Sequence, residues 1–311
     1  MEYRELGRTG LRVSVVGYGT APLGDMFGVN DEDAALQSAF RALDAGINFF
    51  DSSPSYGTRL AERRLGKVLR GRRHEIIVGT KAGQYSPGEF DFSAQRIRRG
   101  FEESLRLLGT DYVDILQLHD VEFVDLEGPL GEAYRELIRL REAGLCRFIG
   151  MTGYPTAMTR RVIAECDLDV TLSYAHCTLL DDSLATEILP LAEERGVGVI
   201  NAAAVALGLL TEAGPPAHIA KVVGEQICAT ARRAVEVCQK RGADVSFLAN
   251  QYSIQRSGCA TTLIGTAKQR HLDSAVAAAE EPIDEDLLAD VLAAIGSDRG
   301  RHWTTGLPQN N

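Results

Sequence analysis

The chain has 311 residues, of which 45% are apolar, and it carries a formal net charge of −10. This length and apolar content can bury a sizeable core, and we expect one domain over residues 1–311. The acidic balance, without a basic stripe, argues against nucleic acid and anionic membranes as partners. No apolar run reaches the about 18 residues that cross a bilayer, and the first residues lack the apolar core of a signal peptide, so we expect a cytoplasmic protein.

Short apolar runs alternate with longer amphipathic segments along most of the chain, which is typical of repeated βα units around a parallel sheet. A small hairpin over residues 3–14, turning at Thr9-Gly10, is predicted ahead of the first strand. The predicted strands cover residues 13–19, 47–51, 76–81, 114–119, 146–152, 170–174, 197–202 and 260–265. Helices are predicted over 31–45, 59–69, 93–108 and 129–143. Eight strands with intervening helices predict an α/β fold of the (β/α)8 TIM barrel type.

The connection between the seventh and eighth strands is unusually long. Gly214 and two prolines break the chain, and helical segments are predicted over 219–240 and 246–255. An insertion of this size on a barrel loop is more often a lid or a cofactor strap than a separate domain. The tail over residues 298–311 is polar and expected to be frayed. Its Trp303 is either a chance apolar residue on a loose end or an aromatic wall over the pocket.

Three predicted strands end in an ionisable residue: Asp51, Lys81 and His119. Each residue alone has an ordinary explanation, such as a helix N-cap, a solvated lysine or a core histidine. All three nevertheless interrupt equivalent positions of parallel strands, and Tyr56 follows the first closely. The sequence therefore predicts that the four side chains share the rim where barrel enzymes keep their chemistry.

These four residue types can move a proton. An ammonium beside a phenol lowers the pKa of the phenol, and a carboxylate keeps the ammonium charged and oriented. Tyr56, Lys81 and Asp51 are thus predicted to form a proton relay, with His119 bonded to the substrate oxygen. The set fits hydride transfer to or from a carbonyl and requires no metal.

Hydride transfer requires a nicotinamide, but no Gly-x-Gly-x-x-Gly turn of a doubly wound fold follows the first strand. A cofactor is therefore expected on the barrel rim. Small-residue turns at 202–208 and 264–266 could offer backbone N–H groups to a pyrophosphate, although tight packing explains these turns equally well.

The six cysteines are scattered, without a Cys-x-x-Cys pair. This spacing suits neither a zinc site nor a disulfide framework, so we expect reduced, mostly buried thiols and no metal.

Several motifs together resemble the aldo-keto reductase family over nearly the full length. They are the Asp51-x4-Tyr56 spacing, the strand ends at Thr80-Lys81 and Leu118-His119, and the runs at 104–114 and 147–152. The resemblance implies a (β/α)8 barrel that binds NAD(P) across its rim. It also implies a catalytic tetrad of Asp51, Tyr56, Lys81 and His119, with Tyr56 as the general acid/base.

Within the family, the chain more closely resembles the L-galactose dehydrogenase branch, whose members oxidise a free aldose at C1 to the lactone with NAD. This resemblance is carried by residues 119–123, 147–153, 172–174, 208–216 and 249–253. The carboxamide contacts of the family fall here on Thr152-Gly153 and Ser173, and an aromatic residue that often stacks under the nicotinamide is replaced by Asn201-Ala202-Ala203. The cofactor-binding residues implied are Gly19, Thr20, Asp51, Thr152, Gly153, Ser173, Asn201, Ala203, Gly208, Leu209, Gly265, Thr266, Arg270, His271 and Ser274.

The resemblance also bears on cofactor choice and substrate. Where NADP-preferring relatives place a Lys and an Arg, this chain has Gly265 and His271, which favours NAD, while the neighbouring Arg270 keeps NADP possible. The implied substrate residues are Tyr56, His119, Asp120, Phe123 and Trp303. Glu122 is either another wall or an ordinary loop carboxylate, and we favour the latter.

The function implied is NAD-dependent oxidation of L-galactose or a similar sugar at C1, by a monomer or homodimer whose partner is a small-molecule sugar. The nearest alternative is an NADPH-dependent aldehyde or ketone reductase on the same scaffold. An alternative of another class is a nicotinamide-binding regulatory subunit that senses redox state.

Overall fold

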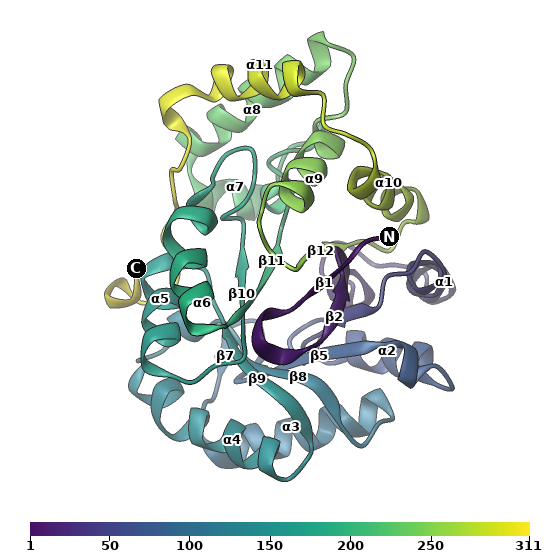
Figure 1. Ribbon diagram of the computed structural model, residues 1–311, viewed down its shortest axis with the longest axis vertical. Helices are drawn as coiled ribbons and strands as arrows, with labels where there is room; N and C mark the ends of the chain where they lie inside the picture. The colour runs from purple at the N-terminus through teal and green to yellow at the C-terminus, as the bar shows by residue number, and fades with distance from the viewer.

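The computed structural model describes all 311 residues, and eight parallel strands close into a barrel. The (β/α)8 prediction is therefore confirmed (Figure 1). Around the barrel the strands are β3 (Val16–Gly19), β4 (Phe49–Asp51), β5 (Ile77–Ala82), β8 (Val113–Leu118), β9 (Cys146–Thr152), β10 (Val170–Tyr174), β11 (Gly198–Ala202) and β12 (Thr261–Gly265).

The strands are buried on both faces, which explains their near-continuous apolar runs. Phe49, Ile115 and Ile200 pack together inside the barrel, whereas their neighbours Phe50 and Leu116 belong to the layer under the helices. Because side chains alternate along a strand, positions 51, 81 and 119 face the interior like Phe49 and Ile115. The alternation thus aims three ionisable side chains into the mouth of the barrel.

Helices surround the barrel and follow the strands. Two of them have N-caps at the first residues of the predicted helices, since the Asp31 and Ser93 side chains accept hydrogen bonds from the N–H groups of Ala34 and Arg96. The helices are α1 (Glu32–Asp44), α2 (Leu60–Leu69), α3 (Ala94–Leu108), α4 (Tyr134–Glu142), α5 (Thr156–Glu165), α6 (Leu189–Arg195), α7 (Ala217–Val223), α8 (Glu225–Lys240), α9 (Val245–Gln255), α10 (Gln269–Glu280) and α11 (Glu285–Ile295).

The amino-terminal hairpin is confirmed, but the first predicted strand is two elements. Residues of β2 (Arg12–Ser14) pair with β1 (Tyr3–Glu5), and only β3 enters the barrel. Leu6, Leu11 and Val13 join the interior cluster, so the hairpin closes one end of the barrel. A second hairpin, β6 (Gln84–Ser86) with β7 (Glu89–Phe90), follows β5 and was not predicted.

The insertion after β11 forms a helical layer with its own core. The segment predicted as one helical stretch over 219–240 divides at Gly224, whose φ of 84° ends α7 before α8 begins. α8 and α9 share an apolar cluster with α11, a helix that the sequence did not reveal. α8 and α11 lie together at the end of the molecule farthest from α3 and α4 (Figure 1).

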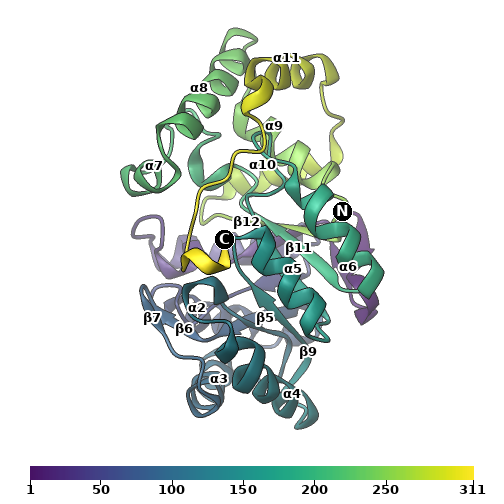
Figure 2. The same ribbon diagram turned by 90° about the vertical axis from the view of Figure 1, so that its left-hand side faces the viewer.

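The carboxyl-terminal tail is fixed to the barrel, so the prediction of a frayed end is wrong. It runs from α11 along one side of the barrel and ends near α5 (Figure 2). The N–H of Leu307 donates to the Glu122 carbonyl at 2.9 Å, and the Asn310 amide donates to the carbonyls of Glu122 and Val124 at 2.8 and 2.9 Å. Asn310 is only 3% exposed, because these contacts bury it.

The predictions about cysteines agree with the structure, where all six thiols are free and buried. None of the helices combines the length and apolar character that a membrane crossing needs.

Candidate active site

Asp51 and Lys81 meet at the carboxyl ends of β4 and β5. The Lys81 ammonium donates to Asp51 Oδ2 and, at 2.8 Å, to the Ser52 carbonyl. Both side chains are at most 2% exposed. The same ammonium lies 5.2 Å from the centre of the Tyr56 ring. The cation is thus held between a carboxylate and a phenol, as the sequence predicted.

His119 completes the group from the end of β8. Its ring meets that of Tyr56 edge-on, with centroids 5.8 Å apart. Its Nδ1 lies 2.9 Å from Ser53 Oγ and 3.4 Å from Ser55 Oγ. Sequence reasoning missed these two serines, although they stand in the short run between Asp51 and Tyr56. With Nδ1 occupied by hydroxyl groups, Nε2 is the ring nitrogen left for a substrate.

The charges of the buried pair support each other. Burial opposes a charge on Lys81, but attraction to Asp51 and Tyr56 outweighs it, and the pKa of Lys81 is raised. Burial raises the pKa of Asp51 against the pull of the Lys81 ammonium. We assign the pair as ionised at neutral pH, because each group stabilises the charged form of the other.

The pKa of Tyr56 departs from the expected direction. Burial raises the pKa of the phenol, and the positive charge of Lys81 only opposes that rise, so the prediction of a lowered pKa is wrong. Burial and the nearby Lys81 hold the pKa of His119 well below its usual value. His119 is therefore a neutral imidazole that can donate one hydrogen bond.

Two glycines fix the backbone that carries Tyr56. A Cβ atom on Gly24 would lie 2.5 Å from the Tyr56 carbonyl oxygen, and one on Gly57 would lie 2.1 Å from the Gly24 carbonyl oxygen. Such distances exclude any side chain at either position. The loops after β3 and β4 consequently pack backbone against backbone, which places the phenol.

The loop after β8 carries a half-buried carboxyl group, Asp120, and a fully buried one, Glu122. Burial raises the pKa of Asp120 to about 6, although Lys81 opposes the rise. Burial and the charge of Asp120 raise the pKa of Glu122 to about 8. Glu122 Oε1 accepts a hydrogen bond from the Tyr154 N–H at 3.0 Å, while Oε2 has no partner. The interpretation of Glu122 as an ordinary loop carboxylate is wrong, because the loop and the tail enclose it.

The ends of β3 and β12 carry small residues, and unpaired polar atoms follow β3 and end β4. Gly19 ends β3 beside Gly265 of β12, and a Cβ added to Gly19 would lie 3.5 Å from the Gly265 Cα. Thr20 Oγ1 and Asp51 Oδ1 are buried without partners. Unpaired buried acceptors and donors cost free energy unless a ligand binds them. The arrangement therefore fits the hydroxyl-rich body of a nicotinamide cofactor.

The loop after β11 has a strained backbone. Ala203, Ala206 and Leu207 have φ values of 60°, 48° and 56°, and Gly208 follows at 95°. Positive φ at residues other than glycine is uncommon and tends to mark binding sites. Leu209 is buried in the core of the insertion. The strain supports the prediction that this loop cradles a ligand.

Other predicted cofactor residues are already bonded within the protein. The Asn201 amide donates to Ser253 Oγ at 2.9 Å and to Thr262 Oγ1 at 3.2 Å, so it joins β11 to α9 and β12. Thr152 Oγ1 accepts from the Asp120 N–H at 3.1 Å. Gly153 lies against Glu122, because a Cβ there would sit 2.6 Å from its Oε2.

Ser173 does not point where the sequence comparison implied. Its hydroxyl lies 3.0 Å from His176 Nδ1, on the outer face of β10. Val170, Leu172 and Tyr174 form the inner face of that strand. Tyr174 interacts electrostatically with Asp120, Glu122 and Tyr56, and burial raises its pKa. Counting alternate positions along β10 could have identified Tyr174 as the rim residue.

The region after β12 is more basic than expected. Burial, Arg270 and Lys268 together lower the pKa of His271, so two cations flank this histidine. Sequence reasoning missed Lys268. Thr266 Oγ1 accepts from the Lys268 N–H at 3.0 Å, and Ser274 is half-buried further along α10. Thr266, Arg270, His271 and Ser274 are among the cofactor-binding residues that the resemblance implies, and Lys268 lies among them.

Aromatic rings border the mouth. Phe123 is 37% exposed and stacks on Phe90 with centroids 5.0 Å apart. Trp303 stacks on Tyr154 at 4.2 Å, which favours the aromatic wall over the loose end. Tyr154 follows β9, so the tail adds a ring to the rim.

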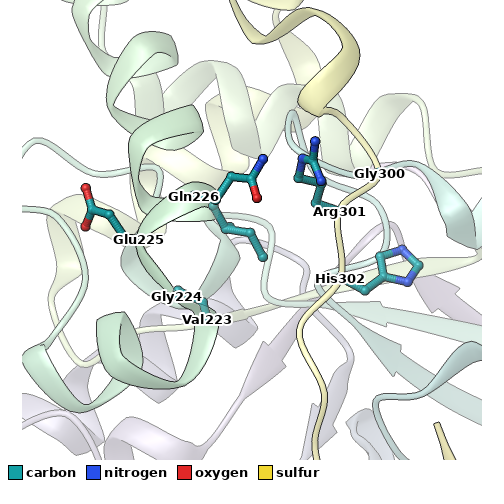
Figure 3. A pocket seen from close by; sticks show the side chains of 8 residues that line it. Val223, Gly224, Glu225, Gln226, Gly300, Arg301 and His302 are labelled. Atoms are coloured by element: carbon teal, nitrogen blue, oxygen red, sulfur yellow. The ribbon is translucent and has the colours of Figure 1, made fainter.

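A separate pocket of about 510 Å³ opens between the α7–α8 junction and the tail. Figure 3 shows the side chains of Gln226 and Arg301 next to each other in its lining. None of the four predicted catalytic residues lines this pocket.

Comparisons with known proteins agree with this geometry. The model of the aldo/keto reductase family matches residues 15–295. The chain is 40% identical to the L-galactose dehydrogenase of Arabidopsis thaliana, covering 100% of this chain and 99% of that protein. It is 30% identical to the D-threo-aldose 1-dehydrogenase of a Pseudomonas species, covering 92% and 95%. The solved holo form of an aldo-keto reductase from Bacillus halodurans superimposes with a TM-score of 0.80 at 25% identity, covering 100% and 99%.

Proposed function

Since the chain belongs to the aldo-keto reductase family, we propose that it oxidises a free aldose, L-galactose or a similar sugar, at C1 to the lactone with NAD. Membership makes it an oxidoreductase that acts on CH–OH groups. The names of its two aldose-dehydrogenase relatives and their coverage of nearly the whole chain support a sugar substrate.

The observation that carries the proposal is the buried Asp51–Lys81 pair beside Tyr56. A bound nicotinamide supplies the hydride acceptor for this chemistry. Because burial raises the pKa of Tyr56, only the minor fraction that has ionised to the phenolate accepts the proton of the C1 hydroxyl. Lys81 stabilises that phenolate by its positive charge, and Asp51 holds the ammonium in place.

His119 positions the sugar in this scheme. As a neutral imidazole it can donate from Nε2 to the oxygen on C1 without adding a positive charge to the site. Ser53 and Ser55 hold the opposite nitrogen and thereby fix the ring. Phe123 and Trp303 offer apolar faces on which a sugar ring can stack.

The test is a screen of NADH formation with L- and D-aldoses, followed by identification of the product. We expect L-galactose or a close stereochemical relative to react and to give the lactone. Turnover on aldehydes with NADPH, and on no aldose with NAD, would refute the proposal.

A second candidate is an NADPH-dependent aldehyde or ketone reductase. The cations Lys268 and Arg270 beside His271 favour it, because a 2′-phosphate needs fixed positive partners. NAD remains the proposed cofactor, since neither cation is at the positions where NADP-preferring relatives place theirs. The ratio of kcat/KM for NAD and NADP decides: a clear NADP preference would establish the second candidate.

A further inference from the structure

Three potential metal ligands meet where the tail crosses the loop after β10. They are His176, Asp181 and His302, and one ligand atom from each lies within 4.8 Å of the others. His302 Nε2 is 2.9 Å from Asp181 Oδ2. The rings of the two histidines meet edge-on, with centroids 5.2 Å apart. No local sequence spacing reveals this group, because the histidines are far apart in the chain.

Two of the three side chains are held ready by other bonds. Asp181 Oδ1 accepts from the Ser183 N–H at 2.9 Å, which leaves Oδ2 to face the tail. His176 Nδ1 lies 3.0 Å from Ser173 Oγ, while its Nε2 is buried without any partner. The whole His176 side chain is inaccessible to solvent. A buried, unpaired ring nitrogen costs free energy unless something binds it.

Bonds made by the two tail residues Arg299 and Gly300 place His302 beside Asp181. The Gly300 N–H donates to the Leu180 carbonyl at 2.8 Å, and Arg299 bonds to Asp182 Oδ2 at 2.8 Å. These bonds fix the tail directly opposite Asp181. In Figure 3 the His302 ring lies on the side of the tail away from Gln226, although His302 also belongs to the lining of the neighbouring pocket.

We propose that His176, Asp181 and His302 bind a divalent transition metal of the Zn²⁺ class, which fastens the tail to the barrel. Two imidazoles and one carboxylate suit Zn²⁺, with water as a fourth ligand. Ser173 orients His176 in the way that second-layer groups orient metal-bound histidines. Tetrahedral bonds of about 2.0 Å need ligand atoms about 3.3 Å apart. Because His302 is partly exposed, its ring can turn and bring the ligand atoms to this spacing.

The site has a consequence for the rim. Trp303 follows His302 directly and stacks on Tyr154, whose ring also lies 4.5 Å from His176. A bound metal therefore holds the Trp303 wall over the mouth, while its loss frees the wall to move. This inference does not depend on the proposed reaction.

The experiment uses the full chain, stripped with a chelator and titrated with Co²⁺, whose absorption reports its ligands. We expect one Co²⁺ per chain, with the absorption of nitrogen and oxygen ligation and no thiolate charge-transfer band. Trp303 is the only tryptophan, so its fluorescence should change on binding. Zn²⁺ should displace the Co²⁺ and raise the melting temperature. Mg²⁺ serves as the hard-ion control and should do neither.

Two variants test the assignment. His302→Ala should abolish binding, and a thermal melt of the metal-free variant checks that it folds without the contact to Asp181. Ser173→Ala should weaken binding roughly tenfold to a hundredfold. His218→Ala removes an exposed histidine of α7 and should leave binding unchanged. Equal affinity in His302→Ala, a thiolate band, or no bound Co²⁺ in the unaltered protein would each overturn the proposal.

Discussion

The ammonium of Lys81 lies 5.2 Å from the centre of the Tyr56 ring, inside a cluster that solvent barely reaches. In such a setting the lysine cannot serve as a solvated surface charge. Its positive charge interacts with both the Asp51 carboxylate and the Tyr56 phenol, and the first two predictions rest on these two interactions.

Tyr56→Phe removes the hydroxyl that we propose exchanges the substrate proton. We expect turnover to fall by about a hundredfold or more, the usual scale of acid–base catalysis, with cofactor affinity unchanged. Steady-state kinetics and cofactor titration measure the two effects. Tyr112→Phe is the matched control, because Tyr112 is exposed and far from the rim. Turnover within a few-fold of the unaltered enzyme would contradict the role of Tyr56.

Lys81→Met leaves the Asp51 carboxylate buried and unpaired. We expect this variant to lose about 3–5 kcal/mol of unfolding free energy, as when one partner of a buried pair is removed. The double variant Asp51→Asn/Lys81→Met should lose less than Lys81→Met alone, since no charge remains buried. Urea denaturation of the single and double variants measures the coupling. Additive losses would show that the two groups do not form an ion pair.

Gly24→Ala tests how Tyr56 is placed. The new Cβ would lie 2.5 Å from the Tyr56 carbonyl oxygen, so the backbone after β4 must shift. Because displacement of about 1 Å can cost a hundredfold in rate, we expect kcat to fall at least about tenfold. Gly128→Ala is the control, since a Cβ there meets nothing and its φ of −65° suits any residue. Equal kinetics for both variants would remove the glycine contact from the account.

Glu122 should make stability depend on pH. Its pKa is raised to about 8 by burial and by Asp120, so between about pH 4.5 and 8 the folded protein holds a proton that the unfolded chain has released. Unfolding free energy should therefore fall as pH rises through this window, with a slope of up to about 1.4 kcal/mol per pH unit.

Glu122→Gln removes this titration. We expect its stability relative to the unaltered protein to increase with pH up to about 8 and then to stay constant. Glu127→Gln changes an exposed glutamate of the same segment and should run parallel to the unaltered protein. Thermal melts across the pH range measure the difference. A Glu122→Gln curve parallel to that of the unaltered protein would mean that Glu122 is charged in the folded state.

The barrel and the meeting of Asp51, Tyr56, Lys81 and His119 were predictable because their signals are local. The bounds of β9 and β10 agree with the predicted strands, since apolar runs between turn signals define them. Asp51, Lys81 and His119 stood out because each ends such a run. The orientation of Ser173 and Tyr174 also lay within reach, through the alternation along β10.

The tail and α11 were missed for a physical reason. Asn310 bonds to Glu122, 188 residues away in the chain, and no periodicity encodes such a contact. Likewise, the direction of the Tyr56 pKa depends on how deeply the fold buries the phenol, which the sequence pattern does not contain. Local patterns thus predicted the elements and the grouping of these side chains, while long-range packing determined their surroundings.

The side-chain amide of Asn310 donates to two backbone carbonyls beside the rim of the barrel. An affinity tag fused directly after Asn311 would therefore disturb the bonds that the tail makes to the loop carrying Asp120 and Glu122. The first residues instead lie by the hairpin that closes the opposite end of the barrel, where the Met1 amine bonds to Glu280 at 3.0 Å.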